Sequence, residues 1–370
     1  MRVLIAPDSF GGTMRADEAA SAMAQGWLTT CALDEVVQLP LSDGGPGFVQ
    51  AMASALSADV VDVVVTGPLG EKVPARFALR GTHAWVEAAS ACGLHRVNES
   101  DLNPEVTTSF GVGELIVAAV DAGAIHITVG LGGTGTNDGG SGMLAALGAT
   151  SSSVTLDQGG SLLAGIEDIN LQSAHQLLNG VTLVAATDVD NPLLGLRGAT
   201  ATFARQKGAD DFAVMRLENA LAKFAEVCGK RADGKDAAVA LGAGAAGGLG
   251  FALIHLGAQR LEGISTVMHS IGFDEQLASS DLVITGEGCL DDQTLHGKVV
   301  MGVAQRAARQ GIPCVVLAGE VRLGKREISN VGIDSAYSMN DLVGREHSFA
   351  QPFQSLEALA ARVAKSWGRR

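Results

Sequence analysis

The sequence predicts an α/β protein of two domains, and three observations support this prediction. The chain has 370 residues, of which 47% are hydrophobic, and this is enough for two buried cores. Near both ends of the chain, short apolar runs alternate with helix-like stretches, which is typical of a parallel sheet. Between residues 60 and 88, three strand-like runs are separated only by tight turns, which indicates antiparallel pairing.

The first predicted domain is built from both ends of the chain. We expect one parallel sheet whose five strands are residues 3–7, 36–40, 281–285, 314–318 and 334–338. Helices are predicted over residues 16–28, 299–310 and 353–367, and the first and last of these have a clear apolar face. The result is a flavodoxin- or Rossmann-like domain of residues 1–59 and 277–370.

A second α/β domain, residues 60–276, is expected to be inserted into the first. Its antiparallel strands are predicted at residues 60–66, 75–79 and 84–88. Further strands are predicted at 126–130 and 181–186, with helices at 113–122 and 215–228.

Composition narrows the classes of function. The net charge of -14 disfavours broad contact with nucleic acid or an anionic membrane. The five cysteines are widely spaced and form no CxxC pair, as expected of reduced thiols in the cytoplasm. No apolar stretch approaches the roughly 18 residues of a membrane span. We therefore expect a cytoplasmic protein with a small-molecule substrate, and the oligomeric state, a homodimer included, stays open.

Acidic residues follow several predicted strands of the first domain. Asp8 and Ser9 follow the first strand, Asp43 the second, Glu287 the third and Glu320 the fourth. Ligands of open parallel sheets bind at the carboxyl ends of the strands, so these groups are expected to converge. Carboxylates there could hold Mg²⁺ or accept a proton from a hydroxyl. The alternative is that the aspartates only cap helices or form turns.

A glycine-rich segment, residues 130–140, directly follows a predicted strand. Its successive amides and threonine hydroxyls suit a phosphate nest. It also contains a formal GxGxxG. A second GxGxxG lies at residues 242–247, and this second segment is better interpreted as a close-packed turn that opens a helix. The acid that a dinucleotide fingerprint requires about 20 residues later is missing, because Asp157 lies in a polar loop. A Walker A pattern is absent as well.

A third cluster follows the predicted strand 181–186. Asp188, Asp190 and Asn191 could coordinate a metal or a polyol, and Lys207 follows within reach. A capped turn is the alternative interpretation.

A fourth cluster lies in residues 285–298. Lys298 precedes a predicted helix, so a cation and a helix N-terminus would face the same anion. Asp291 is a candidate base, whereas His296 is interpreted as a surface residue.

In these segments the chain resembles the type 1 glycerate kinases over nearly its full length. The matching stretches are residues 6–10, 43–45, 65–70, 132–140, 188–195, 206–209, 242–250, 284–288 and 297–298. The resemblance implies two α/β domains with the site in the cleft between them. It also implies ATP-dependent phosphorylation of glycerate, typically to 2-phosphoglycerate, with Mg²⁺.

Phosphoryl transfer needs positioning and charge neutralisation, and this suggests roles for the candidates. We expect Mg²⁺ ligands among Asp8, Asp43, Asp188 and Asp190. Asp188 or Asp291 would accept the hydroxyl proton, with Lys298 as the catalytic cation. The residues expected to bind substrate or phosphate are Ser9, Asp43, Gly132, Gly133, Thr134, Thr136, Asn137, Asp138, Asn191, Lys207 and Glu287.

The chain also departs from the family pattern. Gly11 stands where the family usually carries Lys, Cys289 where it carries Arg, and Pro46 and Phe48 replace Glu and Thr. Three of these changes remove a charged group. The alternatives are therefore a hydroxy-acid kinase of altered specificity or a non-catalytic protein that binds a sugar acid or nucleotide. The remaining alternative is a nicotinamide-dependent dehydrogenase that uses one of the two GxGxxG segments.

Overall fold

The computed structural model describes residues 1–292, 294 and 299–368, and the chain forms two compact units. Unit 1 comprises Met1–Asp43, Gln50–Ser57 and Ile264–Arg370, and unit 2 comprises Gly44–Val49 and Ala58–Gly263. These bounds differ from the predicted domain limits chiefly in residues 44–49, which pack in unit 2, and 264–276, which pack in unit 1.

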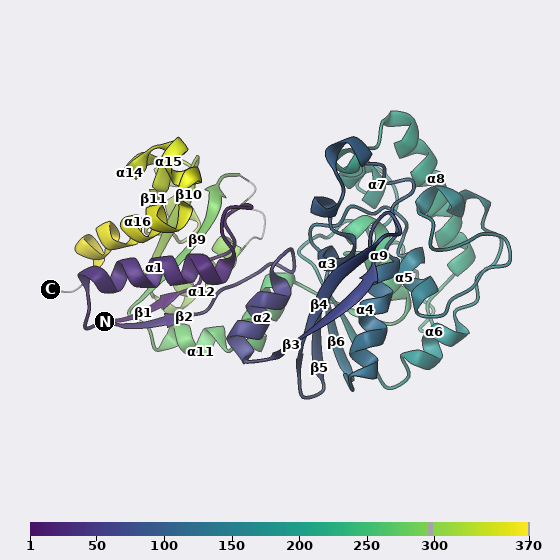
Figure 1. Cartoon of the computed structure of the whole chain (residues 1–370), viewed down its shortest axis with the longest axis horizontal. Coiled ribbons are helices and arrows are strands. Elements are labelled where there is room, and N and C mark those ends of the chain that lie inside the picture. The colour runs from purple at the N-terminus through teal and green to yellow at the C-terminus, as the bar shows by residue number, and fades with distance from the viewer. Residues whose placement is uncertain (293, 295–298, 369–370) are drawn as a thin grey trace. The chain divides into compact units, whose positions relative to one another are not determined.

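Unit 1 contains a five-stranded, fully parallel sheet in the order β11-β10-β9-β1-β2 (Figure 1). Its strands are β1 Arg2–Ile5, β2 Glu35–Gln38, β9 Leu282–Leu290, β10 Cys314–Val321 and β11 Ser335–Ser338. The five predicted strands and their parallel pairing are therefore confirmed.

The lengths of β9 and β10 correct one expectation. Glu287 and Glu320 lie inside these strands, where Glu287 pairs with Ala318 and Glu320 with Cys289. A β-carbon on Gly286 would lie 2.0 Å from the main-chain oxygen of Leu317, so glycine is needed for the strands to pair this far. Both acidic residues thus belong to the ladder and do not follow it.

Helices α1 (Ala16–Thr30) and α16 (Pro352–Trp367) lie side by side in unit 1 (Figure 1). Their apolar faces share one core with alternate residues of the sheet, among them Val3 and Ile5, and the Trp27 side chain is fully buried there. Helix α12 (Val299–Gln310) packs against β9 and β10. The other helices of this part of the chain are α2 Phe48–Leu56, α10 Gly263–Ser270, α11 Phe273–Ala278, α13 Lys325–Asn330, α14 Met339–Val343 and α15 Arg345–Ala350.

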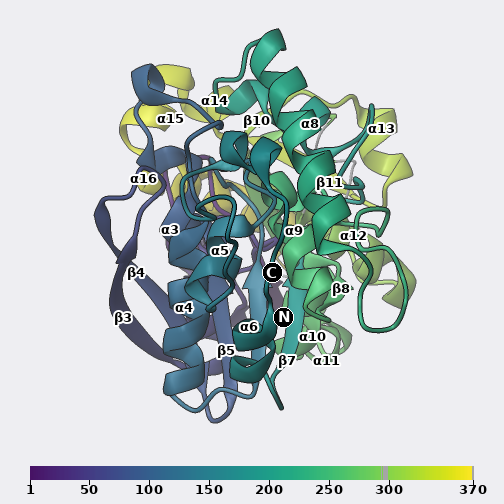
Figure 2. The same cartoon turned by 90° about the vertical axis from the view of Figure 1, so that its right-hand side faces the viewer.

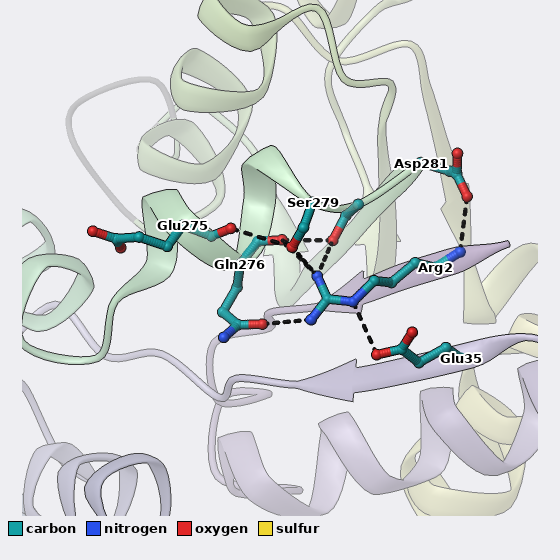
Figure 3. Close-up of polar contacts among 7 residues, drawn as sticks. Arg2, Glu35, Glu275, Gln276, Ser279 and Asp281 are labelled. Atoms are coloured by element: carbon teal, nitrogen blue, oxygen red, sulfur yellow. Dashed lines mark hydrogen bonds and ion pairs between the residues drawn. The ribbon is translucent and has the colours of Figure 1, made fainter.

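Arg2 connects the amino ends of β1, β2 and β9 in unit 1 (Figure 3). Its guanidinium donates to Glu35 Oε1 at 2.9 Å, to Gln276 Oε1 at 2.6 Å and to the Ser279 hydroxyl. Its main-chain amide donates to Asp281 Oδ2 at 2.9 Å. Parallel strands place their amino and carboxyl ends at opposite edges, so this network supports the sheet at the edge away from the predicted site.

Unit 2 contains a six-stranded mixed sheet in the order β3-β4-β5-β6-β7-β8. Strands β3 (Asp59–Thr66), β4 (Lys72–Arg80) and β5 (His83–Glu87) pair antiparallel, as predicted. Strands β6 (His126–Gly130), β7 (Thr182–Ala186) and β8 (Gln259–Leu261) continue the sheet parallel to β5. Strand β8 was not predicted, because three largely polar residues carry no periodic signal.

Helix α4 (Phe110–Asp121) packs against β3, β4 and β5, with α5 (Ser141–Ala146) beside it (Figure 2). The remaining α-helices of unit 2 are α3 Ala88–Cys92, α6 Gln172–Leu177, α7 Ala199–Phe203, α8 Asp211–Cys228 and α9 Ala245–His255. Short 3₁₀ turns occupy Leu94–Arg96, Glu99–Asp101, Gly160–Gly165 and Arg205–Lys207.

All five cysteines are free thiols, as predicted. Within residues 1–292, 294 and 299–368, every helix is either too short or too polar to cross a membrane.

Candidate active site

The carboxyl edge of the unit 1 sheet gathers three of the predicted acids. Asp8 follows β1, Asp43 lies beyond β2, and Glu287 is in β9. The Asp8 amide donates to the Gly286 oxygen at 2.8 Å, and the Ser9 amide donates to Asp8 Oδ1 at 2.7 Å. Burial, followed by the negative charges of Asp43 and Glu287, raises the pKa of Asp8 to about 8. The expected convergence of these side chains is therefore present.

Repulsion among these acids is the electrostatic condition under which a cation binds favourably. In the part of the chain that the structure describes, however, no three His, Cys, Asp or Glu side chains meet in a metal-binding group. Mg²⁺ is usually held by one or two carboxylates together with phosphate oxygens and water, so the charges at Asp8 and Asp43 fit this ion as a companion of a nucleotide.

Thr294 links two further candidates in unit 1. Its buried hydroxyl donates to Glu287 Oε1 at 2.5 Å and accepts the Asp291 amide at 3.1 Å. Asp291, the candidate base, is thereby tied to the same edge of the sheet as Asp8. The predicted catalytic Lys298 and the neighbouring His296 lie outside the described residues.

The glycine-rich loop of unit 2, residues 130–136, follows β6 and is framed by main-chain hydrogen bonds. The Gly132 amide donates to the Gly44 oxygen at 3.1 Å, and the Gly135 amide donates to the Cys92 oxygen at 2.8 Å. A β-carbon on Gly132 would lie 2.5 Å from Gly45 Cα. The Gly132 amide, predicted to bind phosphate, is thus used within the protein, and this glycine lets residues 44–46 approach.

Asp138 supports the loop from inside. Its fully buried carboxylate accepts hydrogen bonds from the amide and hydroxyl of Ser109, both at 2.8 Å, and from the Gly140 amide at 3.0 Å. Burial raises the pKa of Asp138. This corrects its predicted role as a phosphate contact, since a carboxylate so enclosed organises the main chain and does not face a ligand.

Thr136, Asn137 and Lys207 lie beneath the same loop. The Lys207 side chain is buried, and its ammonium group donates to the Thr136 oxygen at 2.6 Å. The Asn137 amide group donates to the Thr200 hydroxyl at 3.1 Å. Of the predicted phosphate-binding residues, these are enclosed in the fold, whereas Gly133 is exposed and Gly132 is half-buried.

The cluster after β7 is tied to its neighbours. Asp190 Oδ1 forms an ion pair with Arg260 of β8 at 2.6 Å, so the predicted metal ligand Asp190 already has a cationic partner. The Asn191 side chain donates to the Arg197 oxygen at 2.7 Å. The half-buried Asp188 lies between β7 and this turn.

The second glycine-rich segment opens α9, as predicted. Ala246, Gly247 and Gly248 have φ of 54°, 67° and 93°, and the Gly139 amide donates to the Gly247 oxygen at 3.0 Å. A β-carbon on Gly247 would lie 2.0 Å from the Thr136 oxygen. These glycines serve close packing between two loops, which removes this GxGxxG from consideration as a dinucleotide site.

Sequence reasoning missed one buried carboxylate next to the loops, that of Glu87 at the end of β5. It is 7% exposed and accepts the amides of Gly47 at 2.9 Å and Val49 at 3.4 Å. Burial raises the pKa of Glu87 to about 7. A charged residue closing an otherwise apolar strand was the available signal.

Comparisons with known proteins show to which family the chain belongs. A family model described as the glycerate kinase family matches residues 3–368. The glycerate kinase of Bacillus subtilis (strain 168) is 40% identical over 373 residues, covering 99% of this chain and 97% of the relative. The glycerate 2-kinase of Escherichia coli (strain K12) is 39% identical over 350 residues, covering 93% and 92%.

A solved structure gives the same result. A crystal structure from Salmonella typhimurium LT2 that is described as a glycerate kinase 2 superposes with a TM-score of 0.83 at 38% identity, covering 99% of this chain and 98% of that one. The match extends over both sheets and both sets of glycine-rich loops. The chain therefore belongs to the glycerate kinase family, a family of kinase enzymes.

Proposed function

We propose that this protein is an ATP-dependent kinase that phosphorylates glycerate to 2-phosphoglycerate with the help of Mg²⁺. The observation that carries the proposal is the full-length similarity to proteins named glycerate kinase and glycerate 2-kinase, at 40% and 39% identity. The acids at the carboxyl edge of unit 1 and the glycine-rich loop of unit 2 add chemical support. The expectation of a cleft site stays a prediction.

Asp8 and Asp43 are the proposed residues for holding the metal in unit 1. Burial, followed by the negative charge of Asp43, raises the pKa of Asp8, and a bound cation would offset both effects. Mg²⁺ would supply neutralisation of the charge on the transferring phosphoryl group.

Asp291 is the proposed acceptor of the glycerate hydroxyl proton in unit 1, because Thr294 holds its main chain beside Glu287. Asp188 is the alternative acceptor in unit 2. Gly133, which is exposed, and Thr134, which is buried beside it, are the residues of the loop 130–136 proposed to bind phosphate. Lys207 would hold this loop in place through its hydrogen bond to the Thr136 oxygen.

The proposal is tested by measuring ADP release from ATP with Mg²⁺ and D-glycerate, with phosphorus NMR to identify the product. We expect 2-phosphoglycerate, and we expect Asp291→Asn or Asp188→Asn to abolish most turnover, whichever residue is the base. Asp341→Asn, an exposed residue of α14, is the control. Absence of ADP release above a glycerate-free sample would refute the proposal.

A kinase for a different hydroxy acid is the second candidate, and the region around Gly11 favours it. Gly11 lacks the cation that the family usually carries here, and a β-carbon on Gly11 would meet no atom within 4 Å among the described residues. ADP release with another hydroxy acid but not with glycerate would select this candidate. Thermal stabilisation by ligands without turnover would select a binding protein.

A further inference from the structure

Glu87 binds the loop of residues 44–49. Its Oε2 atom accepts the Gly47 amide at 2.9 Å and the Val49 amide at 3.4 Å, at the start of helix α2. An ionised carboxylate is a stronger acceptor of main-chain N–H groups than a neutral carboxyl group, and the amino end of a helix favours negative charge. The contact therefore depends on the charge of Glu87.

The loop 44–49 in turn packs directly on the glycine-rich loop 130–136. The Gly132 amide donates to the Gly44 oxygen at 3.1 Å. A β-carbon on Gly130 would lie 2.5 Å from that same Gly44 oxygen, and one on Gly133 would lie 2.8 Å from Pro46 Cδ. The two loops fit together without room for a side chain at either glycine.

Glu87 also lies beside the beginning of the second loop. It is the register partner of Gly130, the last residue of the neighbouring strand β6. One side chain on the rigid sheet thus touches the first loop and adjoins the second. Asp43, a proposed metal-binding residue, immediately precedes the loop that Glu87 holds.

We propose that Glu87 is a positioning residue for phosphoryl transfer. Its carboxylate fixes the loop 44–49, which directly follows Asp43, and through this loop it fixes the glycine-rich loop 130–136. This inference rests on the proposed function and adds to it a residue that contacts neither substrate nor metal. Removal of the carboxylate charge leaves the sheet intact and releases the loop pair.

Protonation of Glu87 is a natural way to weaken the contact. Burial raises the pKa of Glu87 to about 7, although the amides of residues 47–49 and the positive charge of Arg96 act in the opposite direction. Arg96 is the charged group that faces this carboxylate from the neighbouring 3₁₀ turn. Acidification through pH 7 therefore removes the strong acceptor, and the loop amides become less protected.

The first arm of the test needs no catalysis. Amide hydrogen exchange is followed by mass spectrometry in peptides covering 44–49, with correction for the intrinsic pH dependence of exchange. We expect at least tenfold faster exchange in Glu87→Gln than in the wild type at pH 8. Glu114→Gln is the matched control, because the Glu114 carboxylate also accepts a main-chain amide, from Thr66, and lies on α4 in the same unit.

The second arm measures kcat and KM for ATP between pH 5.5 and 9. We expect the wild-type kcat/KM to fall on the acid side of about pH 7, as the carboxylate of Glu87 becomes protonated. Glu87→Gln should lower kcat/KM at least tenfold at pH 8 and remove this acid limb. Glu87→Asp keeps the charge and should restore part of the rate together with the pH dependence.

The possible outcomes distinguish failure of this inference from failure of the proposed function. Unchanged exchange of the 44–49 amides in Glu87→Gln would overturn it, as would faster exchange with an unaltered rate and pH profile. If Glu87→Gln does not fold, Glu87→Asp and the pH dependence of exchange in the wild type carry the test, and pH-independent protection overturns the inference. If the wild type shows no turnover, the proposed function is refuted instead. The exchange experiment still applies in that case, and fast exchange of the 44–49 amides in the wild type would refute the loop-holding role.

Discussion

The ammonium group of Lys207 lies 2.6 Å from the main-chain oxygen of Thr136, and both residues are buried. A lysine of unit 2 thus supports the glycine-rich loop from beneath. Burial lowers the pKa of Lys207 to about 8, and the charge of nearby Asp138 opposes this shift. The cost of enclosing a cation indicates that the loop conformation depends on it.

Lys207→Met should destabilise the protein by about 1–3 kcal/mol at pH 7, because the buried Thr136 oxygen loses its donor. It should also lower kcat/KM for ATP, since the loop is no longer held. The free energy of unfolding from urea denaturation and steady-state kinetics measure the two effects. Lys223→Met on the exposed side of α8 is the control, and equal effects of both changes would contradict the assignment.

Lys207 also predicts a pH dependence of stability. Its folded pKa of about 8 is below the ordinary lysine value of 10.5, so between these values the unfolded chain binds more protons than the folded one. Stability therefore rises with pH across this window, and this increment should be missing in Lys207→Met. The measurement is the free energy of unfolding at pH 8 and pH 10 for both proteins.

Gly132→Ala should destabilise the protein by about 1–3 kcal/mol, because the new methyl group requires main-chain movement. The β-carbon would lie 2.5 Å from Gly45 Cα, whereas at Gly165, which also lies in unit 2, the nearest atom is Val154 Cγ1 at 3.6 Å. Gly165→Ala is therefore the matched control and should be close to neutral. Equal unfolding free energies for the two variants would show that the loops are not packed as described.

Asp8→Asn should stabilise the protein, and the gain should grow with pH. The pKa of Asp8 is raised from 3.8 to about 8, so the folded chain binds more protons than the unfolded one between these values, and stability falls as pH rises through that window. Asparagine removes this loss, so Asp8→Asn should exceed the wild type in stability by a smaller margin at pH 5 than at pH 8, and the margin should grow by about 3–4 kcal/mol between them. Thermal unfolding at both pH values measures the effect.

The control for Asp8 is Asp17→Asn, at the start of α1, where the side chain pairs with Arg15. No growth of the Asp8→Asn difference between pH 5 and pH 8 would contradict the repulsion among Asp8, Asp43 and Glu287. Turnover of Asp8→Asn should be strongly reduced. The variant would therefore be more stable but less active, as expected when like charges are held together for function.

The sequence sufficed for the strands other than β8, because apolar runs such as those of β1 and β10 are stable chiefly as buried strands. It also placed Asp8 and Asp43 correctly, since residues after parallel strands must share an edge. The extent of β9 could not be foreseen, because it depends on the fit of Gly286 against Leu317 of another strand.

The inner structure of the glycine-rich loop was beyond prediction for the same reason. The sequence shows amides suited to phosphate, but which amides bind the protein depends on residues distant in the chain, such as Gly44 for Gly132. Likewise, Asp138 and Lys207 look like ligand contacts until their burial is known. Tertiary packing decides whether a polar residue faces a ligand or supports the loop that does.

Gly11 and Gly12 form the tip of a tight turn that follows Asp8 and Ser9. The Phe10 amide donates to the Met14 oxygen at 2.9 Å, which closes the turn. Both glycines have positive φ, 42° and 80°, and a β-carbon on either would meet no atom of the described residues within 4 Å. Side chains at the two positions would therefore carry a similar backbone cost, of about 1–2 kcal/mol, without a steric clash.

Gly11→Lys should raise kcat/KM about tenfold if the lysine that the family usually carries here contacts phosphate or carboxylate, because a charged hydrogen bond contributes about 1.5–3 kcal/mol. Gly12→Lys is a closely matched control, since it adds the same charge to the same turn at similar backbone cost. Steady-state kinetics with ATP and D-glycerate compare the three proteins. An equal gain in both variants would indicate general attraction of anions to an acidic protein, and no gain in either would show that catalysis in this chain does not need a cation at the turn.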